Sequence, residues 1–117
     1  MWESRLERLP SIALGRGVRI AVAHDILARL AGLAGMRALA PRAGLLIPGC
    51  RSVHTLGMRF ALDLIWLDKR GHVVRIDPSV PPRRVKNCLR ARSVIEARAG
   101  TADAFLAAGL VGSQLTS

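Results

Sequence analysis

The stretch RSVHTLGMRFALDLIWLDKRGHVVRI, residues 51–76, decides the fold class of this chain. Its apolar runs are short, rich in Val, Ile, Leu and aromatic residues, and separated by glycines and charged residues, a pattern typical of β-strands. We predict a strand over residues 51–56, the longest strand of the molecule over 60–67, and its partner over 72–76. Gly57 predicts a bend or β-bulge between the first two.

A tight turn joins the second and third of these strands. The sequence Asp68-Lys69-Arg70-Gly71 has the composition of a hairpin turn, and Gly71 can adopt the positive φ that a bulged type I turn requires. Because a connection this short joins only antiparallel neighbours, the two flanking strands are predicted to pair in that direction.

Upstream of this stretch, the sequence predicts two more strands and a helix. Alternating apolar residues predict a strand over 18–23, and an apolar run bounded by glycine and proline predicts a short buried strand over 44–47. Between them, apolar residues recur at helical spacing over 26–34, after Asp25, a residue type that caps helices. Residues 1–17 are predicted to be an irregular lead-in that can include a short edge strand.

Downstream, the chain alternates between loops and short regular elements. Residues 77–82 predict a turn and an extended, Pro-containing loop, which continues into a basic segment. We then predict a strand over 93–98 and a short helix over 102–108 that Thr101 caps. The apolar tail 110–115 is expected to dock as a last strand.

Strands dominate this prediction, with one early helix and one short late helix. The connections are too short for repeated βαβ crossovers, which argues against a parallel, doubly wound sheet. The sequence therefore predicts an α+β, strand-rich single domain over residues 18–117, built on a mainly antiparallel curved sheet or a small half-closed β-barrel. No internal repeat or second domain is indicated.

The charge of the chain allows nucleic-acid binding without favouring it. The formal net charge is +10, and a basic surface displaces counterions from phosphates. However, sixteen of the eighteen basic residues are arginines spread along the chain, as codon bias in a GC-rich genome produces. The one dense group contains no aromatic residue for base stacking, and we interpret it as a solvated basic surface. It comprises Arg83, Arg84, Lys86, Arg90 and Arg92.

Neither metal nor cofactor chemistry is indicated. Cys50 and Cys88 are far apart and form no Cys-x-x-Cys pair, so two thiols are expected in a reducing compartment, although the fold could bring them together. Cys50, His54, His24 and His72 match no standard spacing for a tetrahedral metal site. A phosphate-cradling glycine loop is also absent from the sequence. We therefore predict no bound metal and no cofactor.

The hydropathy of the chain predicts a cytoplasmic protein. Half of its residues are apolar, which is a globular composition. Yet no uncharged run reaches the roughly 18–20 apolar residues that a membrane-spanning helix needs. The first ten residues, MWESRLERLP, carry charges where a signal peptide has its apolar stretch.

Two acidic residues interrupt otherwise apolar strands. Both faces of the strand over 60–67 are apolar except at Asp63, and Glu96 has apolar neighbours in its own strand. A buried carboxylate is costly unless it is paired or hydrogen-bonded. One interpretation is that both acids anchor backbone or pair with Arg and hold the sheet register. The other is that His54, Arg59, Asp63 and Glu96 converge in a polar pocket for a small ligand.

Matches to a known family run through the same stretch, at residues 53–68, Gly71 and Val73-Val74. Flanking matches occur at residues 29–33, 44–47, 81–82 and 94–100. Taken in this order, they resemble the family called domain of unknown function 192, a set of small bacterial and archaeal proteins without an assigned activity, over residues 18–115. The resemblance implies a compact, strand-rich single domain, and it implies no known chemistry.

The chain departs from that family at one place. Many members carry Trp-Met-Lys-Asn-Thr just before the strand that holds the aspartate, and a proline two residues ahead of the aspartate. Here His54-Thr55-Leu56-Gly57-Met58 and Ala61 occupy these positions. Any role of that Lys and Asn in other members is therefore not carried over to this chain.

Three functions from different classes are compatible with the sequence. We favour a non-enzymatic binding or interaction domain that engages a protein or a small molecule through the concave face of its sheet or the loop 78–92. The second is a small hydrolase-like enzyme in which His54 acts as a general base near Asp63, although no serine lies in a nucleophile elbow. The third is a weak nucleic-acid binder.

Overall fold

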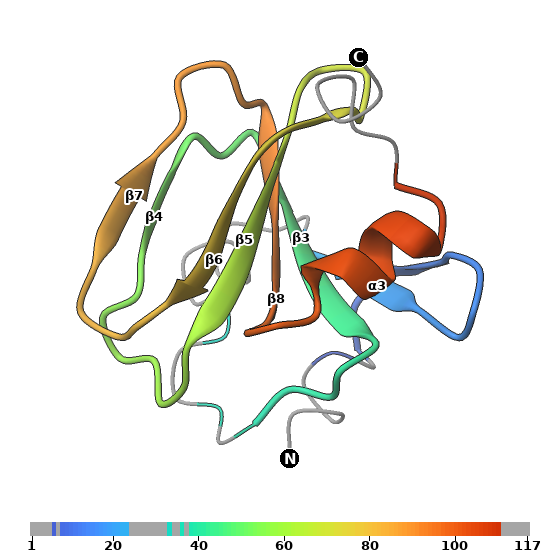
Figure 1. Ribbon diagram of the computed structural model, residues 1–117, viewed down its shortest axis with the longest axis horizontal. Helices are drawn as coiled ribbons and strands as arrows, with labels where there is room; N and C mark the ends of the chain where they lie inside the picture. Colours follow the sequence, from blue (N-terminus) through green and yellow to red (C-terminus); the bar gives the residue numbers. More distant parts are fainter. Residues whose placement is uncertain (1–5, 7, 24–32, 34–35, 37, 111–117) are drawn as a thin grey trace.

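Two β-sheets and a short helix pack in layers in the computed structural model of the chain (Figure 1). The structure describes residues 6, 8–23, 33, 36 and 38–110. The predicted early helix, except for Leu33, and residues 111–115 of the predicted last strand lie outside this part. The described elements are β1 (Ser11–Ala13), β2 (Arg19–Val22), β3 (Ala43–Pro48), β4 (Ser52–His54), β5 (Leu62–Leu67), β6 (Val73–Val80), β7 (Val85–Asn87), β8 (Ser93–Arg98) and α3 (Ala102–Ala107).

The larger sheet is open and mixed. Its six strands follow the order β1-β2-β3-β8-β5-β6, and β2 and β3 run parallel while the other neighbours are antiparallel. The prediction of a strand-rich, mainly antiparallel sheet is confirmed, but the half-closed barrel is corrected. The sheet is open because its edge strands, β1 and β6, do not pair with each other. The strands β4 and β7 form a separate two-stranded sheet.

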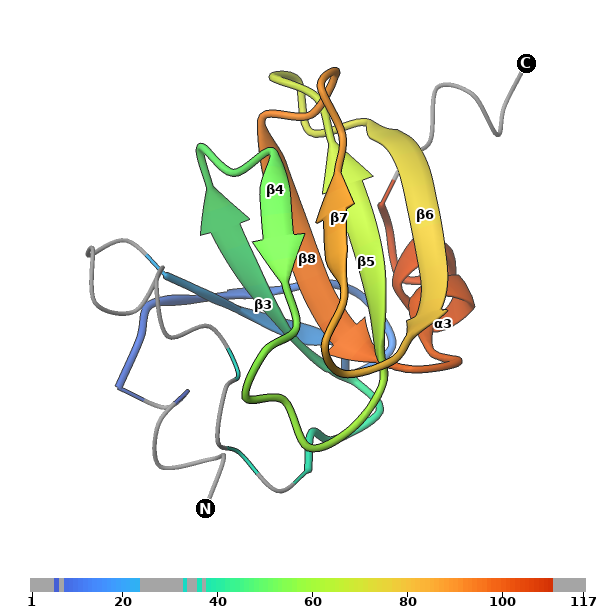
Figure 2. The same ribbon diagram turned by 90° about the vertical axis from the view of Figure 1, so that its left-hand side faces the viewer.

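The small sheet covers one face of the larger one (Figure 2). Val53 of β4 points inward and joins a core with Leu45, Leu64 and Val94 of the larger sheet. Its neighbours Ser52 and His54 are exposed, as the alternation of side chains along a strand requires. We call the face of the larger sheet under β4 and β7 the inner face.

Helix α3 packs against the opposite face (Figure 1). Phe105 of this helix is fully buried against Ile65 of β5 and Ile95 of β8 in a second core. The short late helix predicted from the sequence is therefore confirmed. Thr101 does not cap it, because its hydroxyl donates to the carbonyl oxygen of Arg98 instead.

Most strands form where apolar patterning predicts them. The strands predicted over 18–23, 44–47 and 93–98 correspond to β2, β3 and β8, and Gly71 adopts the expected positive φ of 82° in the hairpin turn. The longest strand is β6 rather than β5, because β6 continues through the segment 77–80 that was predicted to be a loop. An edge strand with a register shift can accommodate Pro78, which explains the difference.

A glycine permits the close contact between β3 and α3. A Cβ atom on Gly44 would lie 2.8 Å from Cε2 of Phe105 and 3.0 Å from Cγ2 of Ile95.

We expect Gly44→Ala to lower the free energy of unfolding by about 1–3 kcal/mol through this overpacking, as measured by urea denaturation. Phe105→Leu in the same chain should recover part of the loss. Equal unfolding midpoints for Gly44→Ala and the parent would contradict the prediction.

Candidate functional site

Two β-turns lie next to each other at one end of the layers. The first spans residues 68–71 and the second 88–91, and each is closed by a hydrogen bond from its last N–H to its first carbonyl oxygen (3.0 and 3.1 Å). The N–H of Arg92 donates to the carbonyl oxygen of Leu67 (2.7 Å), which ties the segment after the second turn to the strand before the first. Both turns therefore present their central residues at the same end.

Five basic side chains gather at this end. Lys69 and Arg70 are central in the first turn, Arg90 is central in the second, and Arg92 follows it. Arg51 joins them, since its Nε donates to the carbonyl oxygen of Ala91 within the second turn (3.1 Å). We call the set Arg51, Lys69, Arg70, Arg90 and Arg92 the basic end.

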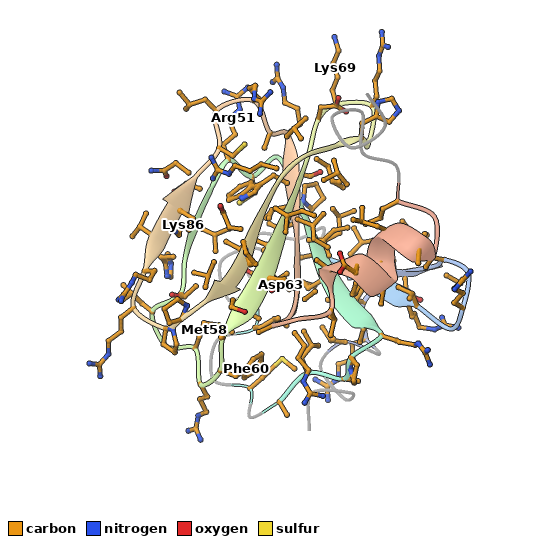
Figure 3. The ribbon with its side chains drawn as sticks, viewed as in Figure 1. Arg51, Met58, Phe60, Asp63, Lys69 and Lys86 are labelled. Carbon is orange, nitrogen blue, oxygen red and sulfur yellow. The ribbon has the colours of Figure 1, made fainter. Side chains whose placement is uncertain are left out.

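Figure 3 shows how the ends of the layers differ. Arg51 and Lys69 lie at one end of the molecule, whereas Met58 and Phe60 lie at the other. All five side chains of the basic end belong to exposed residues. The basic end is therefore available to a partner from solvent.

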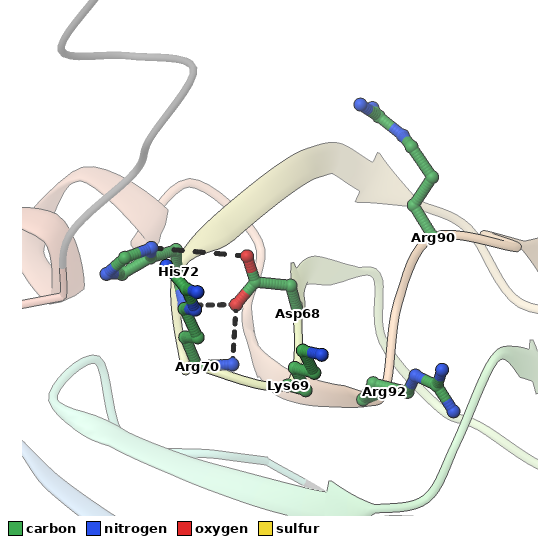
Figure 4. A pocket seen from close by; sticks show the side chains of 6 residues that line it. All are labelled: Asp68, Lys69, Arg70, His72, Arg90 and Arg92. Carbon is green, nitrogen blue, oxygen red and sulfur yellow. Dashed lines mark hydrogen bonds and ion pairs between the residues drawn. The ribbon is translucent and has the colours of Figure 1, made fainter.

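A pocket of about 470 Å³ opens between the two turns (Figure 4). Four cationic side chains line it together with one carboxylate and one imidazole, so positive charge is in excess. Its lining residues are Asp68, Lys69, Arg70, His72, Arg90 and Arg92.

The single carboxylate of the pocket holds the first turn together. Oδ1 of Asp68 accepts the backbone N–H groups of Arg70 (2.8 Å) and His72 (3.0 Å), and its Oδ2 lies 4.0 Å from Nδ1 of His72. The pKa of Asp68 is below its usual value, above all because the N–H of His72 donates to the carboxylate, with a smaller effect of the Arg70 N–H. Asp68 is therefore ionised at neutral pH and serves mainly to order the turn.

Positive charge exceeds negative charge at the basic end within the described part of the chain. None of its five cations forms an ion pair with a described carboxylate. Arg51 and Arg90 donate to the carbonyl oxygens of Ala91 and Val74, which orient the guanidinium groups without cancelling their charge. This arrangement suits an anionic ligand, which guanidinium groups bind with paired hydrogen bonds.

The basic surface predicted from the sequence is divided by the fold. Arg90 and Arg92 lie in the basic end, but Arg83 and Arg84 lie at the opposite end of β7, where the N–H of Thr55 donates to the carbonyl oxygen of Arg84 (2.8 Å). Lys86 lies between them on β7, half-buried and opposite Val53.

The four residues of the predicted polar pocket are not brought together. Asp63 is paired in register with Ala97 and Glu96 with Leu64, so the two carboxylates point to opposite faces of the larger sheet. Asp63 faces the core under α3. Glu96 faces the core on the inner face, which we call the inner core. His54 is exposed on the small sheet, and Arg59 is exposed in the loop before β5.

Asp63 anchors backbone from two distant segments. Its Oδ1 accepts the N–H of Ser79 (2.8 Å), and its Oδ2 accepts the N–H groups of Gly100 (3.0 Å) and Ala102 (2.9 Å). The carboxylate therefore caps the first turn of α3, the role expected of Thr101, and fixes β6 where Ser79 has a positive φ of 48°. Three amide donors engage both carboxylate oxygens, so the contacts of Asp63 are those of a structural anchor.

Glu96 is the one buried acid whose carboxylate is incompletely satisfied in the described part of the chain. The side chain is almost fully buried between Leu45 of β3 and Leu64 of β5, and its Oε1 has no hydrogen-bond partner. Burial raises the pKa of Glu96 to about 7, and a hydrogen bond from the backbone of Leu33 opposes the shift. The surrounding residues are apolar, so this position has the character of core.

Neither cysteine takes part in a disulfide. Cys88 is buried beside Val53 in the inner core, and Sγ of Cys50 lies 3.1 Å from the carbonyl oxygen of Ser52. Within the described residues, no three His, Cys, Asp or Glu side chains gather as metal ligands. Across the same residues, no helix has the length and apolar character to cross a membrane.

Sequence reasoning missed Arg51, Asp68, Lys69, Arg70 and His72 as site residues. The available signal was that two segments, DKRG and CLRAR, each combine a turn with basic residues. The two turns lie close together because β5 pairs with β8, and this pairing sets Leu67 opposite Ser93. In the sequence, 25 residues separate Leu67 from Ser93. No local pattern in the sequence encodes that pairing.

Two solved structures share this fold. One is a candidate transcription regulator from Sinorhizobium meliloti, with a TM-score of 0.68 and 21% identity over 81% of this chain and 82% of that one. The other is a protein of unknown function from Novosphingobium aromaticivorans, with a TM-score of 0.65 and 15% identity over 85% of this chain and 88% of that one. At these identities the similarity concerns the fold alone.

The sequence matches a family as well. No curated protein matches the chain. The family DUF192, described as "Uncharacterized ACR", matches residues 11–110, which include every strand and the helix α3 described above. The resemblance to this family that the stretch 51–76 carries is therefore confirmed. Neither the family nor the structural neighbours establish a specific function. The chain belongs to the DUF192 family.

Proposed function

We propose that this protein is a non-enzymatic binding module that docks an anionic partner on its basic end. The observation that carries the proposal is the convergence of three separate loops on one end of the molecule. They place five cations there without an ion pair to a described carboxylate, and four of the five line a pocket of about 470 Å³. Charges held together in this way repel one another, and an anionic partner relieves that repulsion.

The hydrolase alternative gains no support from the geometry. His54 lies on the exposed side of the small sheet, whereas Asp63 lies under α3, with the inner core between them. A general base must come within hydrogen-bond reach of the proton that it abstracts, so these two residues do not form a base and its orienting partner.

A matched pair of variants tests whether the basic end is the docking surface. Lys69→Glu/Arg70→Glu and Arg83→Glu/Arg84→Glu each reverse two adjacent exposed cations, one pair at each end of the molecule. Both variants have the same net charge. We expect the Lys69→Glu/Arg70→Glu variant to elute from heparin-agarose at clearly lower salt than the Arg83→Glu/Arg84→Glu variant, because local charge density determines counterion release.

The same pair of variants also has a decisive negative outcome. Equal elution of the two variants would show that retention follows net charge alone, and the proposal would be wrong. Unchanged thermal unfolding of both variants is the control that their folds are intact. Titration with a short DNA duplex belongs in the same experiment, because one structural neighbour is a candidate transcription regulator.

A further inference from the structure

A single large apolar side chain protrudes from the basic end. Leu89 is 83% exposed, the highest value among the exposed large hydrophobic residues of the described chain. It occupies the first central position of the turn 88–91, directly before Arg90. The neighbouring turn presents Lys69 and Arg70 at the two equivalent positions. An apolar tip is thus surrounded by cations.

We propose that the basic end docks on an anionic lipid bilayer, with Leu89 inserted between the headgroups and the surrounding cations on their phosphates. This inference rests on the proposed function and names its partner. A leucine at the tip of a turn can enter a bilayer without moving any strand. Membrane-surface binding combines apolar insertion with attraction to anionic lipids, and this end offers both.

Other anionic partners would not use the apolar tip. A soluble phosphate ligand in the pocket leaves Leu89 in water. A nucleic acid would bind the same cations, but single strands are held by stacking of their bases on aromatic side chains, and no Phe, Tyr or Trp lines the described pocket. The exposed leucine therefore favours a bilayer over both.

The opposite end of the molecule provides a demanding comparison. Leu56 is 57% exposed in the turn 55–58, and Arg83 and Arg84 lie beside it. That end lacks the pocket and its four cationic side chains, and its leucine protrudes less. We therefore assign docking to Leu89, and the two leucines form a matched pair for mutagenesis.

Sedimentation with vesicles tests the assignment. The full chain is mixed with vesicles of phosphatidylcholine alone or of phosphatidylcholine with phosphatidylglycerol. We expect binding only to the second. Lys69→Glu/Arg70→Glu should lower the affinity for these vesicles by a factor of at least about twenty, because each lost cation costs a factor of about five. Leu89→Ser should weaken it roughly tenfold, whereas Leu56→Ser should leave it unchanged.

The variants separate failure of this inference from failure of the proposed function. If Leu89→Ser binds the vesicles as the parent does, or if Leu56→Ser is the weaker variant, the bilayer inference is overturned while the heparin result still stands. Tight DNA binding that Leu89→Ser leaves unchanged, without vesicle binding, would replace the bilayer with a nucleic acid. Equal heparin elution of the two charge-reversed variants would remove the proposed function itself.

Discussion

Replacing Asp63 with asparagine is expected to lower the free energy of unfolding by about 3 kcal/mol, although the two side chains have nearly the same shape. The carboxylate accepts three backbone N–H groups, from Ser79, Gly100 and Ala102. An amide has one accepting oxygen, so its NH₂ group must face at least one of these donors. A buried N–H without an acceptor then adds its desolvation cost to the lost charged hydrogen bond.

Chemical denaturation and hydrogen exchange together test this expectation. Asp103→Asn is the matched control, because Asp103 lies exposed in the first turn of the same helix and should change stability by no more than about 0.5 kcal/mol. The amides of Gly100 and Ala102 should exchange faster in the Asp63 variant. If the two variants unfold at the same denaturant concentration, Asp63 does not anchor these segments as described.

The sequence correctly indicated that Asp63 needs a partner but not which one. The requirement follows from apolar residues on both sides of a strand, which is a local pattern. The partners Ser79 and Gly100 lie 16 and 37 residues away and are set by the register of β5 against β6 and β8. Anchoring of backbone and pairing with Arg were both expected, and backbone amides fill that role.

Whether Asp63 and Glu96 share one face of the sheet also depends on the register between β5 and β8. A shift of one residue between β5 and β8 would have placed both carboxylates on one face. The observed register pairs Glu96 with Leu64 instead and separates them. The strand β7 was missed for a different reason, since three residues with an exposed Val85 carry too little alternation to indicate a strand.

Only part of the basic end was predicted from the sequence. Its first turn was predicted from Gly71, and its second contributed Arg90 and Arg92 to a predicted basic surface. The two turns become neighbours through β5 and β8, a non-local contact. Arg83 and Arg84 are close to Arg90 in sequence, but β7 extends between them and places them at opposite ends. Residues that are close in the sequence lie far apart in space when an extended strand runs between them.

Glu96 gives the chain an unusual dependence of stability on pH. Its carboxyl group is buried among apolar side chains, and this burial raises its pKa from 4.5 to about 7 in the folded protein. The folded state therefore holds a proton that the unfolded state releases between these two values. As the pH rises through this window, the unfolded state ionises and is stabilised while the buried carboxyl group stays protonated, so stability falls. The full penalty, about 3 kcal/mol, is present above the folded pKa and absent below the unfolded one.

Glu96→Gln isolates this effect, because glutamine stays neutral at every pH. Its free energy of unfolding relative to the parent should increase by about 3 kcal/mol between about pH 4 and about pH 8, whatever constant offset the buried amide introduces. Urea denaturation of both proteins across this range measures the difference, and titration of all other groups cancels in it. A difference between Glu96→Gln and the parent that is independent of pH would mean that Glu96 ionises in the folded state near its ordinary pKa, and hence that water or a cation reaches its Oε1.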